Sequence, residues 1–220
     1  MQPFFISGIG TGIGKTVVSA LLTEALQADY WKPIQAGFEE GTDKQTVRSL
    51  ISNAQSVIHP ETYLLKLPAS PHIAAREENI RIDFNRLLDQ FQTFDSSRPL
   101  IIEGAGGLLV PLNDSDLVID LIKKLDAKLI LVSRNYLGSI NHSLLSAEIC
   151  RFHELTVAGW VFNDQFMDYE GEIVSWTGIP ALFSIPFLKN RSRESVYMEV
   201  QRMGERVRNL LLPVPGHPRE

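Results

Sequence analysis

The chain has 220 residues, of which 44% are hydrophobic and 21% are charged, and its formal net charge is -5. This composition is typical of a folded domain and excludes a disordered chain, while the mild acidity without a basic tract argues against a nucleic-acid partner. The single cysteine, Cys150, can form neither an internal disulfide nor a cysteine-rich metal site, which favours a reducing compartment. Because the sequence shows no targeting segment and no apolar run as long as a membrane span, we expect a cytoplasmic protein without a membrane partner.

Strands and amphipathic helices are expected to alternate along the chain. Short apolar runs predict strands at residues 3–7, 30–34, 100–102, 128–133, 156–162 and 181–185. Apolar residues at helical spacing predict helices at residues 15–28, 43–51, 84–94, 117–125, 140–155 and 196–212. This alternation predicts a three-layer α/β fold, with a mostly parallel central sheet and helices on both faces. We expect a single domain over residues 1–212, an irregular segment at residues 53–81 and a disordered tail at residues 213–220.

A glycine-rich loop separates the first predicted strand from the first predicted helix. Residues 8–16 read GIGTGIGKT, and the backbone N–H groups of such a loop, together with the helix N-terminus, bind phosphates. Lys15 is expected to reach the outer phosphates of a nucleotide, and the Thr16 hydroxyl is expected to bind Mg²⁺. The loop departs from the usual spacing, because the first glycine belongs at position 9, where Ile9 stands. The pattern predicts a P-loop NTPase-like domain; the alternative is a glycine-rich turn with an exposed lysine.

Two acidic residues are candidate ligands for a nucleotide-bound Mg²⁺, which requires oxygen ligands. Glu103 follows a predicted strand and precedes a glycine-rich turn, so its carboxylate points toward the sheet edge where ligands bind in parallel sheets. The alternative role for Glu103 is a charge that ends a strand. Asp43 begins a predicted helix, and it is equally consistent with a metal ligand and with a simple N-cap.

Several separated segments, taken together and in this order, resemble the dethiobiotin synthetase family, the ATP-dependent ligases of biotin synthesis. The resemblance covers the chain from Phe5 to about Leu188. Its segments are GKT at residues 14–16, KPIQAG at 32–37 followed by Asp43, SPH at 70–72, EGAGG at 103–107 with PL at 111–112, LGSINH at 137–142, AGWVFN at 158–163 and IP at 185–186.

The resemblance implies a reaction and a set of site residues. The reaction is the ATP- and Mg²⁺-dependent joining of CO₂ or bicarbonate to 7,8-diaminononanoate, through a carbamate and a carbamic-phosphoric anhydride, to give dethiobiotin, ADP and phosphate. The implied catalytic residues are Lys32, Lys15 and Thr11, and the implied Mg²⁺ ligands are Thr16, Asp43 and Glu103. The implied nucleotide-binding residues are Gly12, Ile13, Gly14, Lys15, Thr16, Val17, Asp43, Glu103, Gly104, Ala105, Gly106, Asn163, Asp164, Pro186, Phe187 and Leu188.

The resemblance also implies how the diamine is bound. The implied substrate-binding residues are Lys32, Ala36, Gly138, Ser139, Ile140 and Asn141. The last four begin a predicted helix whose free N–H groups suit the substrate carboxylate, and in the family they come from the neighbouring subunit, which implies a homodimer. Ala36 stands where the family often has a hydroxyl, so this position offers only its backbone.

Simpler roles for these residues and other functions remain open at the level of sequence. Lys32 is alternatively an exposed lysine, Asn163 a turn residue and the segment at 138–141 an ordinary helix start. The competing function is a P-loop switch ATPase of the partitioning type that acts on a protein partner. Against it stands Gly10, where those ATPases carry a second lysine. An amidating synthase would require a nucleophilic cysteine, and Cys150 lacks the surrounding glycines of a nucleophile elbow.

Overall fold

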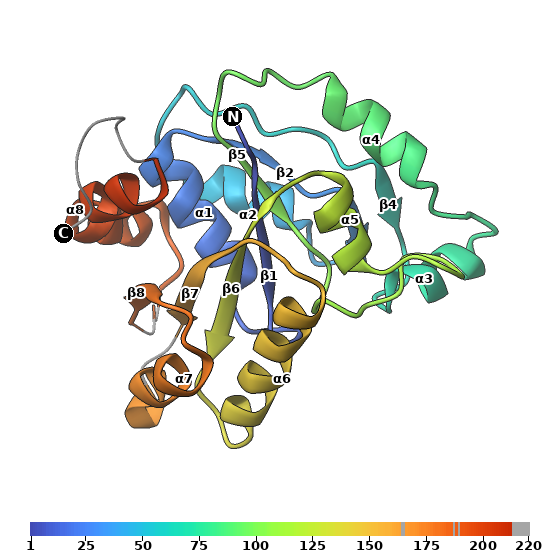
Figure 1. Ribbon diagram of the computed structural model, residues 1–220. Helices are drawn as coiled ribbons and strands as arrows, with labels where there is room; N and C mark the ends of the chain where they lie inside the picture. The colour runs from blue at the N-terminus through green and yellow to red at the C-terminus, as the bar shows by residue number, and fades with distance from the viewer. Residues whose placement is uncertain (164–165, 187, 189, 213–220) are drawn as a thin grey trace.

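The computed structural model describes residues 1–163, 166–186, 188 and 190–212, and its centre is a six-stranded sheet (Figure 1). The strand order is β2-β5-β1-β6-β7-β8, and every neighbouring pair runs parallel. The sheet consists of β1 (Phe4–Gly8), β2 (Asp29–Trp31), β5 (Leu100–Glu103), β6 (Lys128–Arg134), β7 (Val157–Asn163) and β8 (Ala181–Ile185). The predicted parallel α/β sheet is therefore confirmed, and the bounds of β8 are those predicted.

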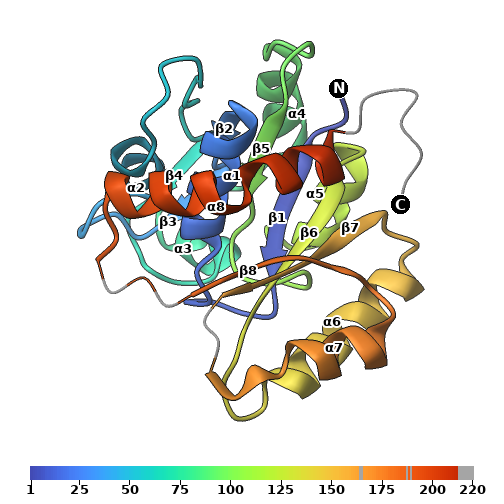
Figure 2. The ribbon, with the colours of Figure 1, turned by 90° about the vertical axis from the view of Figure 1, so that its left-hand side faces the viewer.

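Helices cover both faces of the sheet, because successive residues of a strand point to opposite sides. Ile6 of β1 packs with the face that holds α1 and α8, whereas its neighbour Phe5 packs with the face that holds α5 and α6. Figure 2 shows α8 lying across α1 on the first face. The helices are α1 (Lys15–Leu26), α2 (Asp43–Leu50), α3 (Pro71–Glu77), α4 (Phe84–Gln92), α5 (Val118–Lys124), α6 (Ser139–Phe152), α7 (Glu170–Thr177) and α8 (Arg193–Leu211), with a short 3₁₀ turn η1 (Phe166–Asp168).

The prediction of a single strand at residues 30–34 is wrong. The chain forms β2, leaves the main sheet at Lys32, and then forms β3 (Ile34–Ala36), which pairs with β4 (Tyr63–Leu65) in a separate two-stranded parallel sheet. The break falls at Pro33, which has no N–H to donate to a neighbouring strand. Its carbonyl oxygen accepts hydrogen bonds from the N–H groups of Thr62 and Tyr63 instead. This break places Lys32 at the edge of the sheet.

The segment at residues 53–81 is less irregular than predicted, since it contains β4 and α3. Helix α3 begins with Pro71, and proline is favoured at the first helical position because its missing N–H needs no partner there. Helix α7 was also not predicted. The tail at residues 213–220 lies outside the described residues.

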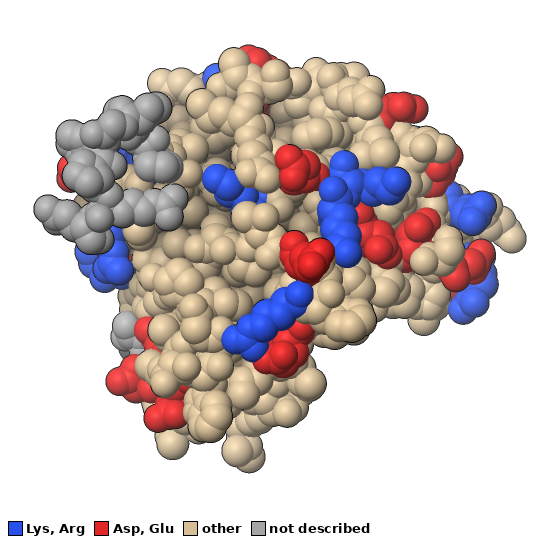
Figure 3. All heavy atoms as spheres, viewed as in Figure 1, with Lys and Arg blue, Asp and Glu red and all other residues tan. Residues whose placement is uncertain are grey.

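The expectations about a membrane span, surface charge and Cys150 can be compared with the structure. No helix in the part of the chain that the structure describes is long and apolar enough to cross a membrane. On the face in Figure 3, Lys and Arg side chains lie beside Asp and Glu side chains. Cys150 is buried, and burial raises the pKa of its thiol to about 12, so this side chain packs in the core.

Candidate active site

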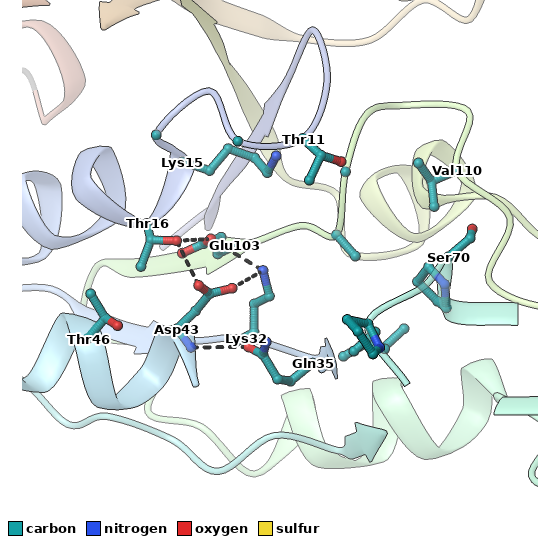
Figure 4. Close-up of a pocket in the computed structure, with 18 of the residues that line it drawn as sticks. Thr11, Lys15, Thr16, Lys32, Gln35, Asp43, Thr46, Ser70, Glu103 and Val110 are labelled. Carbon is teal, nitrogen blue, oxygen red and sulfur yellow. Dashed lines mark hydrogen bonds and ion pairs between the residues drawn. The ribbon is translucent and has the colours of Figure 1, made fainter. Parts of the chain in front are cut away.

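A cavity of about 660 Å³ opens at the carboxyl ends of β1 and β5. The glycine-rich loop forms one wall, and β3 with the start of α2 forms another. Residues 68–71, which lead into α3, and the turn after β5 also contribute to the lining. Figure 4 shows Thr11 and Lys15 on the glycine-rich loop and Lys32 and Gln35 on the opposite side of the cavity. The cavity lies where ligands bind in open parallel sheets.

The glycine-rich loop has the backbone geometry of a phosphate-binding loop. Gly12 and Gly14 have positive φ values of 73° and 95°, which glycine adopts without steric cost. A Cβ on Gly14 would lie 2.0 Å from Asn163 Nδ2, and this amide nitrogen donates a hydrogen bond of 2.7 Å to Ile13 O. A Cβ on Gly8 would clash with the Ile13 side chain, so the early glycine makes room for Ile13 in the core.

Lys15 is held inside the cavity by a contact with the backbone of its own loop. Its Nζ donates a 2.7 Å hydrogen bond to Gly10 O, and the residue is 7% exposed. Burial, helped by repulsion from Lys32, lowers the pKa of Lys15 to about 8. A phosphate group in the loop would compensate for both effects, because it supplies a negative charge and acceptor oxygens.

Thr16, Asp43 and Glu103 bring three hard oxygen donors together (Figure 4). Thr16 Oγ1 lies 2.9 Å from Asp43 Oδ1 and 2.9 Å from Glu103 Oε1. The hydroxyl has one proton, so it can donate to only one of these carboxylates, and a cation would stabilise the remaining oxygen contact. An oxygen-only donor set with two carboxylates is the chemistry that Mg²⁺ prefers. These residues therefore fit a magnesium ion.

The Lys32 ammonium lies between the two carboxylates. Its Nζ is 2.7 Å from Asp43 Oδ2 and 3.3 Å from Glu103 Oε1, and it donates to Gly104 O at 3.2 Å. Burial alone would lower the pKa of Lys32, but attraction to Glu103 and Asp43 outweighs it and raises the pKa above the ordinary value. Burial likewise opposes ionisation of Asp43, and the Lys32 charge lowers its pKa nonetheless. Lys32 thus stays a buried cation at the carboxylate pair.

Comparison with known proteins identifies the family. A family model described as an AAA domain matches residues 2–195. The ATP-dependent dethiobiotin synthetase BioD of Cytophaga hutchinsonii is 51% identical over 187 residues, which cover 84% of this chain and 88% of that protein. The enzyme of the same name from Agrobacterium fabrum is 47% identical over 195 residues, covering 88% of this chain and 90% of that protein. The chain belongs to the dethiobiotin synthetase family.

Solved structures with a similar fold come from other ATPases. The MinD cell division protein of Aquifex aeolicus aligns with a TM-score of 0.63 and 11% identity over the full length of both chains. A ParA family ATPase of Chlorobium tepidum aligns with a TM-score of 0.55 and 15% identity over 97% of this chain and 93% of that one. At these identities the likeness shows the fold alone, which confirms the predicted P-loop NTPase-like architecture.

Most residues that the resemblance to dethiobiotin synthetases selected lie at one cavity. Those that line it are Thr11, Gly12, Gly14, Lys15, Thr16, Val17, Lys32, Ala36, Asp43, Glu103, Ala105 and Gly106. Ile13 and Gly104 lie directly behind the lining, where their carbonyl oxygens accept hydrogen bonds from Asn163 and Lys32. Leu188 packs against the core on the α1 face, and Pro186 directly follows β8. Asp164 and Phe187 lie outside the described residues.

The start of α6 does not line this cavity within one chain. The N-terminal turn of α6 consists of Gly138, Ser139, Ile140 and Asn141. Its N-cap residue is Gly138, which has no side chain to bond the first N–H groups of the helix. A smaller cavity of about 200 Å³ lies between α6 and residues 107–109 and is partly lined by His142. That these residues serve a site in a neighbouring subunit stays a prediction.

Three residues at or beside the cavity were not selected by the sequence analysis. Gln35 is 8% exposed and accepts a 3.1 Å hydrogen bond from Asp43 N while donating one of 2.8 Å to Gly37 O. It lies inside the KPIQAG segment, but an amide has no obvious chemistry in phosphoryl transfer, so nothing singled it out. Arg191, from the segment before α8, also lines the cavity. Tyr30 lies in a predicted strand, and no motif in the sequence marks it.

Proposed function

We propose that this protein catalyses the ATP- and Mg²⁺-dependent carboxylation and ring closure of 7,8-diaminononanoate to dethiobiotin. Its relatives are named ATP-dependent dethiobiotin synthetases, and this name supports ATP as the co-substrate and dethiobiotin as the product. The observation that carries the proposal is the position of Lys32, a buried cation that shares one cavity with the phosphate loop and with the Asp43–Glu103 carboxylate pair. A site that only hydrolyses ATP would not need a second buried lysine on the side opposite the phosphate loop.

The chemistry explains why two lysines are needed. CO₂ adds to one amine of the diamine and gives a carbamate, whose anionic oxygens make its carbon a poor electrophile. A carbamate oxygen attacks the γ-phosphorus of ATP, ADP leaves, and the product is a carbamic-phosphoric anhydride. The second amine then attacks the carbamate carbon, the C–O bond to phosphate breaks, and the ring closes. Both phosphoryl transfer and ring closure place negative charge in the cavity.

Different residues of this chain stabilise different parts of that negative charge. Lys15 leaves Gly10 O and binds the β- and γ-phosphates, and Thr11 contacts the transferring group from the same loop. Lys32 binds the carbamate and the transferring phosphoryl, and Ala36 contacts the substrate through its backbone. Thr16, Asp43 and Glu103 hold Mg²⁺, which when bound neutralises phosphate charge and aligns the γ-phosphate. All of these side chains already line one cavity, so the two lysines need only exchange their present oxygen partners for ligand oxygens.

The nucleotide base and the substrate carboxylate occupy opposite ends of the site in this proposal. Asn163, whose Nδ2 is engaged with Ile13 O, keeps its Oδ1 as an acceptor for the adenine amino group. Asp164, Pro186, Phe187 and Leu188 complete the base site. The start of α6 binds the substrate carboxylate of a partner subunit, so the working unit is a homodimer. Leu137, 93% exposed beside this helix start, supports a second copy on this surface.

The remaining expectations form part of the same proposal. Residues 1–212 act as one domain, and the enzyme works in the cytoplasm without a nucleic-acid or membrane partner. The interspersed acidic and basic side chains in Figure 3 support this view of its surface. The switch-ATPase alternative rests on fold likeness alone, and no other observation favours it.

The test is ADP release from the purified protein with Mg-ATP and bicarbonate, in the presence and absence of 7,8-diaminononanoate. We expect ADP release that depends on the diamine and dethiobiotin detected by mass spectrometry. ADP release that is indifferent to the diamine, without dethiobiotin, would overturn the proposal and favour a switch ATPase.

A further inference from the structure

A fully buried tyrosine stands behind the Glu103 carboxylate. Tyr30 lies in β2, is 0% exposed, and donates a 2.9 Å hydrogen bond from its hydroxyl to Glu103 Oε2. It does not line the cavity, so it has no direct access to a nucleotide or a substrate. A buried tyrosine hydroxyl needs a partner, and here this partner is one of the two carboxylates that would bind Mg²⁺ in the proposed mechanism.

The donors around Glu103 divide between its two oxygens. Oε1 faces the cavity, where it lies 2.9 Å from Thr16 Oγ1 and 3.3 Å from Lys32 Nζ. Oε2 faces the interior and accepts from Tyr30. Thr16 and Lys32 both line the cavity and would exchange partners when ligands bind, whereas among the described residues the Tyr30 hydroxyl has no hydrogen bond besides the one to Glu103. The Tyr30 bond is the contact to Glu103 that persists.

The position of Tyr30 is fixed by the sheet. Strand β2 pairs with β5 so that Tyr30 lies opposite Ile101, two residues before Glu103. The Tyr30 N–H donates to Val57 O, and its carbonyl oxygen accepts from His59 N. By contrast, the terminal torsion of a glutamate is soft, so its carboxylate can rotate and present either oxygen. A hydroxyl anchored on the neighbouring strand decides which oxygen faces the site.

We propose that Tyr30 is a positioning residue for the magnesium site: its hydroxyl holds Glu103 Oε2 and thereby keeps Oε1 directed at the metal. The inference rests on the metal-binding role proposed for Glu103. Hydrogen-bond partners that orient metal ligands typically change metal affinity by about 10- to 100-fold when removed. Removal of the Tyr30 hydroxyl should therefore weaken metal binding although no atom of Tyr30 touches the metal.

The experiment measures Mn²⁺ binding to the protein with ADP by electron paramagnetic resonance, which needs no turnover. The variants are Tyr30→Phe, Glu103→Gln, their combination, and Tyr63→Phe as a matched control. Tyr63 is also a buried tyrosine, and its hydroxyl accepts a 2.9 Å hydrogen bond from Asp83 N, but it lies outside the cavity lining. We expect Tyr30→Phe to raise the Mn²⁺ dissociation constant about tenfold or more. Tyr63→Phe should leave it unchanged, and Tyr30→Phe should add nothing in the Glu103→Gln background.

The outcomes separate this inference from the proposed function. If Glu103→Gln weakens Mn²⁺ binding and Tyr30→Phe changes it less than twofold, Tyr30 only packs and the inference is wrong. If neither variant changes Mn²⁺ binding, Glu103 is not a ligand, and both the inference and the proposed metal role fail. Melting of the metal-free proteins shows whether each variant folds. Should Tyr30→Phe not fold, the tyrosine absorption difference spectrum of the wild type on adding Mg²⁺ to the ADP-bound protein replaces it. Metal bound at Oε1 withdraws charge from the carboxylate that accepts the Tyr30 hydrogen bond, so we expect a shift of the tyrosine absorption that Glu103→Gln abolishes. An unchanged wild-type spectrum overturns the inference.

Discussion

Lys32 Nζ lies 2.7 Å from Asp43 Oδ2, and this ion pair joins a catalytic candidate from the end of β2 to a metal-ligand candidate at the start of α2. The lysine is 5% exposed, so its charge is held by Asp43 and Glu103 rather than by water. Without ligands, Lys32 therefore neutralises the same carboxylates that would bind Mg²⁺. Lysine and metal compete for these oxygens, and substrate binding can release Lys32 from the competition by giving it a carbamate to bind.

Lys32→Ala should lower dethiobiotin formation by at least about 100-fold, the usual effect of removing one preorganised group that stabilises transition-state charge. ADP binding should persist, because Lys15 and the phosphate loop remain. Mn²⁺ affinity without substrate should rise, since the competing cation has gone. The matched control is Lys44→Ala, which removes another lysine paired with a carboxylate, Glu61, away from the cavity lining. Near-normal turnover in Lys32→Ala would remove Lys32 from the mechanism.

Gln35→Ala should raise the Mg²⁺ concentration needed for half-maximal activity several-fold and have a smaller effect on kcat. Its Oε1 accepts from Asp43 N, so the amide fixes the first turn of α2 and the direction of the Asp43 carboxylate. Gln45→Ala is the control, because Gln45 Oε1 accepts from Thr42 N in the same helix cap but the residue is exposed. Gln35→Ala loses two side-chain hydrogen bonds and Gln45→Ala loses one, each worth about 1 kcal/mol, so a change in Mg²⁺ dependence out of proportion to the stability loss identifies positioning. Equal Mg²⁺ dependence in both would show that Gln35 only stabilises the helix end.

Nucleotide affinity should fall with rising pH because of Lys15. Burial lowers the pKa of its ammonium to about 8 in the free protein, while a bound phosphate favours the charged form. Above pH 8 the ADP dissociation constant should therefore rise, by up to about tenfold per pH unit. The effect on stability has the opposite sign: below pH 8 the buried Lys15 charge destabilises the nucleotide-free protein, and because the unfolded chain binds more protons between pH 8 and 10.5, this destabilisation decreases over that window. Isothermal titration with Lys15→Met as the reference tests this, and the same slope in both proteins would contradict it.

Gly14→Ala and Gly12→Ala form a pair that separates backbone strain from collision. Both residues have positive φ, which costs an alanine roughly 1–2 kcal/mol. A Cβ on Gly12 meets nothing within 4 Å, but one on Gly14 lies 2.0 Å from Asn163 Nδ2. We expect Gly14→Ala to weaken ADP binding at least about tenfold more than Gly12→Ala. Because Asn163 is also the proposed adenine contact, adding Asn163→Ala should recover part of the melting temperature that Gly14→Ala loses, without restoring ADP affinity. Similar ADP affinities in the two single variants would show that the collision is relieved by loop movement.

The sequence predicted the parts of the site that follow from the edge of a parallel sheet. Thr16 and Glu103 could be placed together because the carboxyl ends of β1 and β5 meet there. The sequence left Asp43 undecided between metal ligand and N-cap; the structure assigns the capping bond to Thr42, which frees the Asp43 carboxylate for the cavity. The roles of Tyr30 and Gln35 could not be predicted. The Tyr30 hydroxyl bonds to Glu103, which is distant in the sequence, and the bond from Asp43 N to Gln35 depends on the change of chain direction at Pro33.

Helix α7 shows a different limit of sequence patterns. Its eight residues bury only Ile173 and Thr177, while Trp176 is exposed, so no apolar stripe marks it. The periodicity that predicted the other helices is produced by burial against the sheet, and α7 packs mainly on α6. Because α7 is stabilised by another helix at the rim of the fold, few of its residues are buried. Its sequence therefore shows no detectable helical periodicity of apolar residues.

Mixing two inactive variants should restore activity if the start of α6 serves the partner's site. Lys32→Ala inactivates the cavity of its own chain, and Asn141→Asp places a negative charge at the helix start that would receive the substrate carboxylate. In a dimer with one copy of each, one composite site takes intact Lys32 from one chain and intact Asn141 from the other. Random exchange of equal amounts gives such dimers half the time with one of two sites intact, so about a quarter of wild-type activity is expected. A mixture that stays inactive after proven subunit exchange would place α6 at its own chain's cavity or outside the site.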